Sequence, residues 1–222
     1  MYYFKKNCDY VSNTLKLTFP KGLDVEVLKL DALIKSQNQL KTNYTKSVCV
    51  FCGSREGSKP EYKLAAIELG KLLSEVKFRL VYGGGNLGLM GALASSAQQN
   101  NCEILGIIPQ HLMEKEVGKT NLKNLIVTKN MHERKNLMYN ESDAIMILPG
   151  GVGTLDEFFE IITWGQLGLH KKYIFLLNID GFWSPLLNLL AHQVNHGFMD
   201  KSINKLFSVV GTPREAINYL TN

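Results

Sequence analysis

The stretch ILPGGVGTLDE, residues 147–157, joins an apolar run to three glycines and then to a predicted helix. Glycines let a ligand approach bare backbone, and the N-terminus of a helix offers unpaired N–H groups at the positive end of its dipole. The pattern therefore predicts a site for an anion such as phosphate. Asp156 and Glu157 are expected in the first helical turn, which indicates that something attached to the phosphate reacts there.

Glu157 also has a second interpretation. Thr154 and Glu157 have the spacing of a T-x-x-E capping box, in which the carboxylate would only bond back to the helix backbone. The glycines of PGGVGT leave the helix mouth open, so a carboxylate here can face a ligand and still act as a cap when no ligand is bound. The spacing is compatible with both roles.

A second charged motif, NMHERK at residues 130–135, is predicted to begin another helix. Asn130 and Glu133 fit a capping box, which places Arg134 and Lys135 just beyond the first turn, where the helix dipole does not favour cations. Another group could hold them there. On spacing alone, a solvated basic turn and an anion-binding or catalytic role are equally supported.

Two further motifs raise the question of a cofactor or a metal. GGGNLG has the G-x-G-x-x-G spacing of a dinucleotide site at Gly83, Gly85 and Gly88, but GIIPQ stands where an acidic residue should hold the ribose. Glycines that let a helix pack close to the sheet, or a loop around a mononucleotide, are favoured over NAD. HQVNH, residues 192–196, has a zinc-binding histidine spacing but a glutamine in place of the catalytic glutamate of zinc proteases, so we expect no metal.

These motifs must be positioned by the segments around them. From residue 47 onward, near-continuous apolar runs alternate with helical patterns, which predicts an α/β, doubly wound, Rossmann-like parallel sheet with helices on both faces. The loops CGSREGS, GGGNLGLMG and PGGVGT follow three of the strands and should converge on one crevice. Residues 1–46, with a strand-like TLKLTF and a helix-like VEVLKLDALIKSQNQL, are predicted to be an N-terminal extension of unknown role, beside a single domain at 47–222.

Composition narrows the class of protein. The chain has 222 residues, 45% of them hydrophobic, and can bury one core. It shows no signal-peptide pattern and no apolar run of the roughly 20 residues that a membrane helix needs, so we expect a cytoplasmic protein without a membrane partner. Cys49 and Cys52 should face opposite sides of a strand, which favours core packing over disulfide, redox or zinc chemistry. The net charge of +5 comes from scattered Lys and Arg, so nucleic acid is not expected as a partner.

PGGVGTLDE and MHERK together resemble the paired signature of the LOG family, the cytokinin riboside 5'-monophosphate phosphoribohydrolases, which usually shows P-G-G-x-G-T-x-x-E and M-H-x-R-K. VFCGS, YGGGNLGLMG, LGIIP, residues 113–116 and ITWGQLGLHKK also resemble their family counterparts in order and spacing. The resemblance covers residues 47 to about 212 and leaves out the extension. Family proteins are often labelled lysine decarboxylases, but nothing in this sequence resembles a pyridoxal phosphate site.

The resemblance implies hydrolysis of the N-glycosidic bond of an adenine-type nucleoside 5'-monophosphate, with Arg134 and Glu157 as the catalytic pair. It implies no cofactor, and a homodimer with helices of both chains near the site. Asp156 departs from the family, which more often has Glu there. The positions implied to contact the nucleotide are Ser54, Gly84, Gly85, Asn86, Met90, Glu116, Arg134, Lys135, Gly150, Gly151, Val152, Gly153, Thr154, Leu155, Asp156 and Thr163.

The resemblance leaves one alternative function open. Wider relatives of the family, such as molybdenum-cofactor carriers, bind nucleotides or cofactors without hydrolysis, and a protein of that class would use the phosphate loop only as a clamp. The presence of both Arg134 and Glu157 favours the enzyme. The base, adenine or an N6-prenylated adenine, is not specified by any motif.

Overall fold

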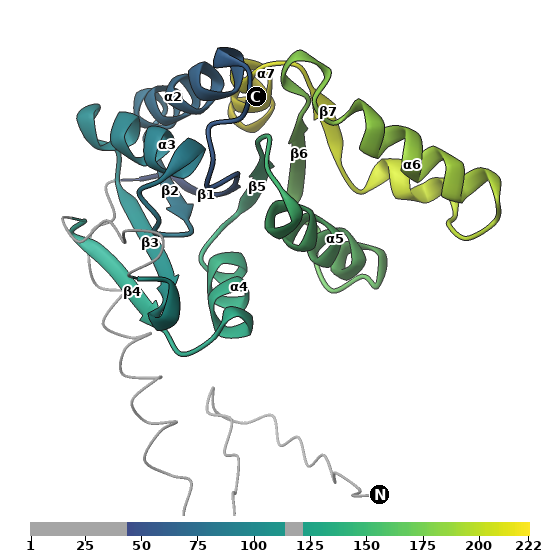
Figure 1. Cartoon of the computed structure of the whole chain (residues 1–222), viewed down its shortest axis with the longest axis horizontal. Coiled ribbons are helices and arrows are strands. Elements are labelled where there is room, and N and C mark those ends of the chain that lie inside the picture. Colours follow the sequence, from purple (N-terminus) through teal and green to yellow (C-terminus); the bar gives the residue numbers. More distant parts are fainter. Residues whose placement is uncertain (1–43, 114–121) are drawn as a thin grey trace, which may run out of the picture. The chain divides into compact units, whose positions relative to one another are not determined.

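A computed structural model describes residues 44–113 and 122–222 (Figure 1). A seven-stranded sheet forms its centre, with the strand order β4-β3-β2-β1-β5-β6-β7 and parallel pairing throughout. The strands are β1 (Lys46–Phe51), β2 (Phe78–Tyr82), β3 (Ile104–Pro109), β4 (Asn124–Thr128), β5 (Ala144–Ile147), β6 (Tyr173–Leu177) and β7 (Ser208–Val210). The predicted doubly wound α/β class is confirmed.

Helices cover both faces of the sheet. They are α2 (Pro60–Glu75), α3 (Gly88–Gln99), α4 (Met131–Asn140), α5 (Val152–Gln166), α6 (Ser184–Asn195) and α7 (Pro213–Thr221). Val48 and Val50 of β1 pack with α2 and α3, whereas Cys49 packs with α5 and α6. Cys52 lies in the first of these two cores, so the prediction that the two cysteines face opposite sides is confirmed. Figure 1 shows α2 and α3 on one side of the sheet and α5 on the other.

The order of strands reverses at β1. β2 pairs with one edge of β1 and β5 with the other, so that Val48 lies opposite both Leu80 and Ala144. Such a reversal leaves a crevice beyond the carboxyl ends of the central strands. The loops that follow β1, β2 and β5 are the three glycine-rich loops predicted to converge there.

Two helices differ from the sequence prediction. α5 begins at Val152 rather than at Leu155, because Gly151 is the N-cap and the first turn includes Gly153 despite its low helix propensity. α7 is absent from the predicted elements, although its start carries a capping signal. The Glu215 N–H donates to Oγ1 of Thr212 at 3.2 Å, and Thr212 directly precedes the proline that opens the helix.

Predictions about the extension fall outside the described residues. TLKLTF and VEVLKLDALIKSQNQL therefore stay predictions. The predicted boundary between residues 46 and 47 lies within the described residues, one residue after β1 begins at Lys46. Within residues 44–113 and 122–222, no helix is long and apolar enough to cross a membrane.

Candidate functional site

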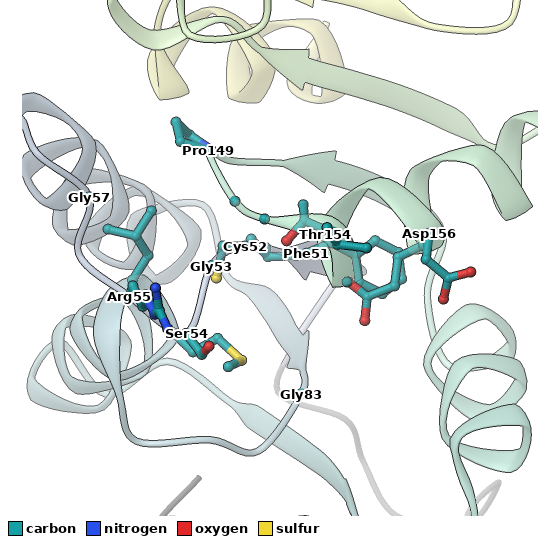
Figure 2. A pocket seen from close by; sticks show the side chains of 18 of the residues that line it. Phe51, Cys52, Gly53, Ser54, Arg55, Gly57, Gly83, Pro149, Thr154 and Asp156 are labelled. Carbon is teal, nitrogen blue, oxygen red and sulfur yellow. The ribbon is translucent and has the colours of Figure 1, made fainter. Parts of the chain in front are cut away.

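A cavity of about 550 Å³ lies where the loops after β1, β2 and β5 meet (Figure 2). Its wall includes residues 53–57 from the first loop, Gly83 from the second and residues 149–153 from the third. The predicted convergence of the three loops is confirmed. The volume lies within the range of about 300–1,000 Å³ that is typical of small-molecule sites.

The N-terminus of α5 opens into this cavity without a side-chain cap. Gly151 is the N-cap, and the first intrahelical bond runs from the Leu155 N–H to the Gly151 carbonyl at 3.1 Å. The N–H groups of Val152, Gly153 and Thr154 precede that bond and are available to an anion. All three residues line the cavity.

The capping-box interpretation of Thr154 and Glu157 is wrong. With the helix beginning at Val152, Thr154 is the third helical residue, and Asp156 and Glu157 lie beyond the first turn. The carboxylate of Glu157 is therefore too far along the helix to act as a reciprocal cap. The prediction that Asp156 and Glu157 lie in the first helical turn is therefore also wrong.

Close packing at the third loop requires one of its glycines. A Cβ on Gly150 would collide with Oγ1 of Thr154 and lie 3.0 Å from the backbone nitrogen of Gly53. Gly151 and Gly153, by contrast, have open space where a Cβ would stand. Gly150 thus lets the loops after β1 and β5 touch, and the other two leave the helix mouth accessible to a ligand.

Glu157 and Arg134 reach the cavity from two different helices, α5 and α4, and both side chains are buried, with 8% and 5% exposure. Both charges act on the thiol of Cys49 in β1. Burial raises the pKa of Cys49 well above its usual value, Glu157 adds to the rise, and Arg134 opposes it. Both members of the predicted catalytic pair therefore line the same cavity, close to β1.

Arg134 is held by the loop after β2. Its Nη2 donates to the carbonyl of Gly83 at 3.1 Å, and its Nη1 lies 3.7 Å from Sδ of Met131. A Cβ on Gly83 would collide with Nη2, so the first glycine of GGGNLG makes room for the guanidinium. The buried Nε has no hydrogen-bond partner among the described residues.

The predicted capping box of α4 is confirmed in its first half. The Glu133 N–H donates to Oδ1 of Asn130 at 2.9 Å. Oε2 of Glu133 accepts from the Lys129 N–H at 2.8 Å instead of from the N-cap residue. This cap fixes the start of α4, and with it the position of Arg134 one residue later.

Lys135 joins α4 to α5. Its Nζ lies 3.0 Å from Oδ2 of Asp156 and 3.1 Å from Oε2 of Glu160. Burial alone would lower the pKa of Lys135, but the hydrogen bonds with Asp156 and Glu160 outweigh it and the pKa is raised. Lys135 does not belong to the described cavity wall. The contacts indicate a clamp between the helices that carry Arg134 and Glu157.

We expect Lys135→Met to lower both thermal stability and turnover. The loss of the ammonium leaves Asp156 and Glu160 as like charges one turn apart, and the cost should lie between that of an exposed and a buried ion pair, about 1–3 kcal/mol. Each kcal/mol shifts the Tm of a domain of this size by about 2–4 °C. Thermal melts measure the stability, and hydrolysis of AMP, the reaction that the resemblance implies, measures the turnover. An unchanged Tm with lost nucleotide affinity would instead support the direct contact implied by the resemblance.

Not every residue implied to contact the nucleotide lies at the cavity. Ser54, Met90, Gly150, Gly151, Val152, Gly153, Thr154 and Asp156 line it together with the catalytic pair. Gly84, Gly85, Asn86, Leu155, Thr163 and Lys135 do not belong to its described wall, and Glu116 lies outside the described residues.

Two of the residues outside the cavity wall have structural contacts elsewhere. Gly84 has a φ of +73°, and a Cβ there would lie 3.0 Å from Cβ of Ile108, so this glycine serves the turn and the packing on β3. Thr163 is exposed on α5, and its Oγ1 donates to the Phe159 carbonyl at 2.6 Å.

The wall residues that the sequence analysis did not single out include Arg55, Tyr62 and Phe182. Tyr62 and Phe182 meet edge to face with ring centroids 5.3 Å apart. Gly57, with φ +81°, marks the turn against which Tyr62 packs, since a Cβ on Gly57 would lie 2.7 Å from its ring. Gly57, in the loop CGSREGS, was the feature of the sequence from which this turn and the packing of Tyr62 could have been predicted.

The two histidines of HQVNH lie close together, with ring centroids 4.0 Å apart. Nδ1 of His196 lies 2.9 Å from the carbonyl oxygen of His192, an interaction within the helix end. In the part of the chain that the structure describes, no group of three His, Cys, Asp or Glu residues could hold a metal ion.

The sequence of this chain is similar to those of known proteins. A family model described as "Possible lysine decarboxylase" matches residues 90–220. The cytokinin riboside 5'-monophosphate phosphoribohydrolase LOG of Oryza sativa subsp. japonica is 43% identical over 170 residues, 77% of this chain and 70% of that protein. A cytokinin riboside 5'-monophosphate phosphoribohydrolase of Arabidopsis thaliana is 41% identical over 175 residues, 79% of this chain and 81% of that protein. The chain belongs to the LOG family.

Solved structures agree with the LOG fold. The molybdenum cofactor carrier protein of Chlamydomonas reinhardtii matches with a TM-score of 0.61 and 20% identity, over 80% of this chain and 96% of that one. The molybdenum cofactor binding protein of Rippkaea orientalis matches with a TM-score of 0.60 and 23% identity over the same shares. At such identities the likeness shows the fold alone.

The decarboxylase description of the LOG family model has no counterpart in the cavity of this chain. Enzymes that use pyridoxal phosphate hold it through a lysine amine as a Schiff base. The described cavity wall contains no lysine, and the nearby Lys135 is already bound to two carboxylates.

Proposed function

We propose that this protein hydrolyses the N-glycosidic bond of adenine-type nucleoside 5'-monophosphates, the cytokinin riboside 5'-monophosphates among them, to the free base and ribose 5-phosphate. The observation that carries the proposal is a buried carboxylate, Glu157, that lines the same cavity as the uncapped N-terminus of α5. An anion site and a carboxylate side by side suit a substrate in which a phosphate and a breakable sugar bond lie close together. The names of the relatives in Oryza and Arabidopsis support the same reaction.

The reaction needs a carboxylate near C1' of the ribose. As the bond from C1' to the base nitrogen breaks, the sugar gains oxocarbenium character, which a carboxylate stabilises. The same carboxylate takes a proton from the water whose oxygen bonds to C1', and the departing base gains a proton. Glu157 has this role in the proposal.

Arg134 supplies the cation beside this carboxylate. A buried carboxylate is costly unless an opposite charge or hydrogen bonds compensate it. The Gly83 carbonyl and the Asn130 cap fix Arg134 in the cavity wall, where its charge can stabilise the carboxylate and its guanidinium can hold the ribose.

The 5'-phosphate should be required for turnover. The N–H groups of Val152, Gly153 and Thr154 can hold a dianion, and remote binding energy of this kind positions the reacting bond. Each charge-assisted hydrogen bond lost costs about 1.5–3 kcal/mol, so removing two should lower kcat/KM about a hundredfold or more. Adenine release from AMP and from adenosine, measured side by side, tests this. Equal rates for the two would contradict the phosphate-anchor proposal.

One incubation separates the enzyme from the binding-protein alternative. The purified protein is mixed with AMP or isopentenyladenosine monophosphate, and free base and ribose 5-phosphate are measured by chromatography. Release of either base supports the hydrolase, and the ratio of the two rates identifies the preferred base. Tight nucleotide binding without release from either substrate would favour a non-catalytic carrier of the same fold.

We propose that the protein acts as a homodimer. Thr163 lies outside the described cavity wall, on the exposed side of α5, yet the resemblance assigns it a nucleotide contact, which a second copy of the chain could use. Leu167 and Leu169 at the end of the same helix are 68% and 67% exposed, and a subunit interface would cover them. Light scattering after size exclusion should give twice the chain mass, and a monomer at micromolar concentration would contradict the proposal.

We also propose a cytoplasmic location. Cys49 and Cys102 are free thiols in the described residues, as is usual in a reducing compartment. Fractionation of cells followed by immunodetection tests the location, and recovery from a secreted fraction would contradict it.

A further inference from the structure

Arg55, in the loop CGSREGS after β1, has no role in the proposed reaction so far. It lines the cavity, and Figure 2 shows it on one side of the site with Asp156 on the other and Thr154 between them in that view. Within residues 44–113 and 122–222, its guanidinium forms no hydrogen bond or ion pair with another side chain. Arg55 is exposed, so its guanidinium at the wall of the cavity is free to bind an anionic ligand.

The charges around Arg55 are already satisfied. Glu56, the next residue, is bound by Nζ of Lys63 at 2.6 Å. Lys59 forms an ion pair with Asp180, which lies in the loop after β6. Glu56 and Asp180 are therefore each paired with a lysine, and neither pairs with Arg55.

The backbone that carries Arg55 is fixed. The Gly53 N–H donates to the Pro149 carbonyl at 3.0 Å, and the Leu89 N–H donates to the Gly53 carbonyl at 3.1 Å. Gly88 has a φ of +56°, and a Cβ there would collide with the backbone of Ser54 and Arg55. The loop after β1 is therefore held against both the loop after β5 and the start of α3.

This arrangement brings Arg55 near the N-terminus of α5. A Cβ on Gly53 would lie 3.2 Å from Cα of Gly150, so the two loops are in contact. Arg55 is two residues after Gly53, at most about 7 Å along an extended chain. An arginine side chain starting there can reach a ligand seated on the N–H groups of Val152 and Gly153.

The other arginine of the described wall is less available. Arg134 uses Nη2 on the Gly83 carbonyl and Nη1 on the sulfur of Met131. Arg55 keeps all five of its donors for a ligand, in the fork geometry that suits a phosphate. We infer that Arg55 binds the 5'-phosphate of the substrate from the side opposite the N-terminus of α5. The inference rests on the proposed function for the identity of the ligand.

Equilibrium binding tests this inference without hydrolysis. Arg55→Ala and Arg55→Lys are introduced into the full chain carrying Glu157→Gln, and the Kd values of AMP, adenosine and ADP are measured by calorimetry. Loss of one charge-assisted contact predicts an increase in the Kd of AMP of about tenfold to a hundredfold for Arg55→Ala, with a smaller increase for Arg55→Lys. The Kd of adenosine should not change. Inorganic phosphate should displace AMP less well after Arg55→Ala.

Arg214→Ala is the matched control, since Arg214 is exposed near Glu68 and lies outside the described cavity wall. It removes the same charge and should leave the Kd of AMP unchanged. An unchanged Kd of AMP after Arg55→Ala, or an equal loss for AMP and adenosine, would overturn the inference. A loss confined to ADP would do so too, because it would place the guanidinium at a second phosphate. If AMP binds as expected but is never cleaved, the proposed hydrolysis fails and the role of Arg55 stands.

Discussion

Glu157→Gln should abolish most of the hydrolysis of AMP while the protein stays folded and still binds the nucleotide. The amide keeps the size of the side chain at a position with only 8% exposure, but it cannot carry the charge or accept the proton of the attacking water. The loss of a positioned acid or base typically costs about 10²-fold to 10⁴-fold in kcat. Initial rates of adenine release, with the Kd of AMP from calorimetry, measure the two effects separately.

The neighbouring acid Glu160 provides the control for this prediction. Glu160→Gln removes the same charge from α5, but Glu160 binds Lys135 and does not line the described cavity. Its kcat should therefore stay within a few-fold of the wild type. If Glu157→Gln kept near wild-type turnover, the carboxylate would have only a structural role and the mechanism would be wrong.

Arg134→Met should lower kcat by a similar factor, about 10²-fold to 10⁴-fold. Methionine fills much of the buried space beside Gly83, but it removes the cation that we propose stabilises Glu157 and the bond to the Gly83 carbonyl. Loss of a nearby positive charge disfavours the ionised form of a buried carboxylate, and the neutral form cannot stabilise an oxocarbenium ion. Steady-state kinetics with AMP, at equal amounts of folded protein, measure the loss.

Arg79→Met separates this effect from simple loss of a buried arginine. Arg79 in β2 is 14% exposed and donates to Glu141 at 2.8 Å and to Ser47 at 2.9 Å, outside the described cavity wall. The Arg79 variant should lose Tm and keep kcat, whereas the Arg134 variant should lose kcat even where it remains folded. Full activity of Arg134→Met would remove Arg134 from the mechanism.

Local sequence patterns were sufficient to predict the sheet and most of its helices. Parallel strands covered on both faces are apolar along their whole length, and the loops after β1, β2 and β5 carry glycines, so these strands could be recognised. The start of α5 could not, because the glycines that keep its mouth open have a low intrinsic helix propensity. Their place in the helix depends on the packing of Gly150 against Thr154 and Gly53.

Many residues of the candidate site could be predicted from the sequence, but the long-range contacts between them could not. Spacing indicated a phosphate loop and a pair of charged residues, and the resemblance supplied their roles. No local pattern relates Arg134 to the Gly83 carbonyl, which lies 51 residues earlier, or Lys135 to Glu160 on the next helix. Such contacts arise from the way the helices dock on the sheet, and Arg55 was overlooked for the same reason.

The pairing of β1 with β5 links the cavity to the folding of the chain. The two strands join segments 96 residues apart, as between Ser47 and Asp143, and each strand ends in a loop of the site. Contacts of such long range form only after a large loss of chain entropy, so partly folded chains have no complete cavity. A nucleotide bound there stabilises only the finished fold, by about 2.7 kcal/mol at a hundred times its Kd. In a cell, the lifetime of this protein would then rise and fall with the supply of its own substrate.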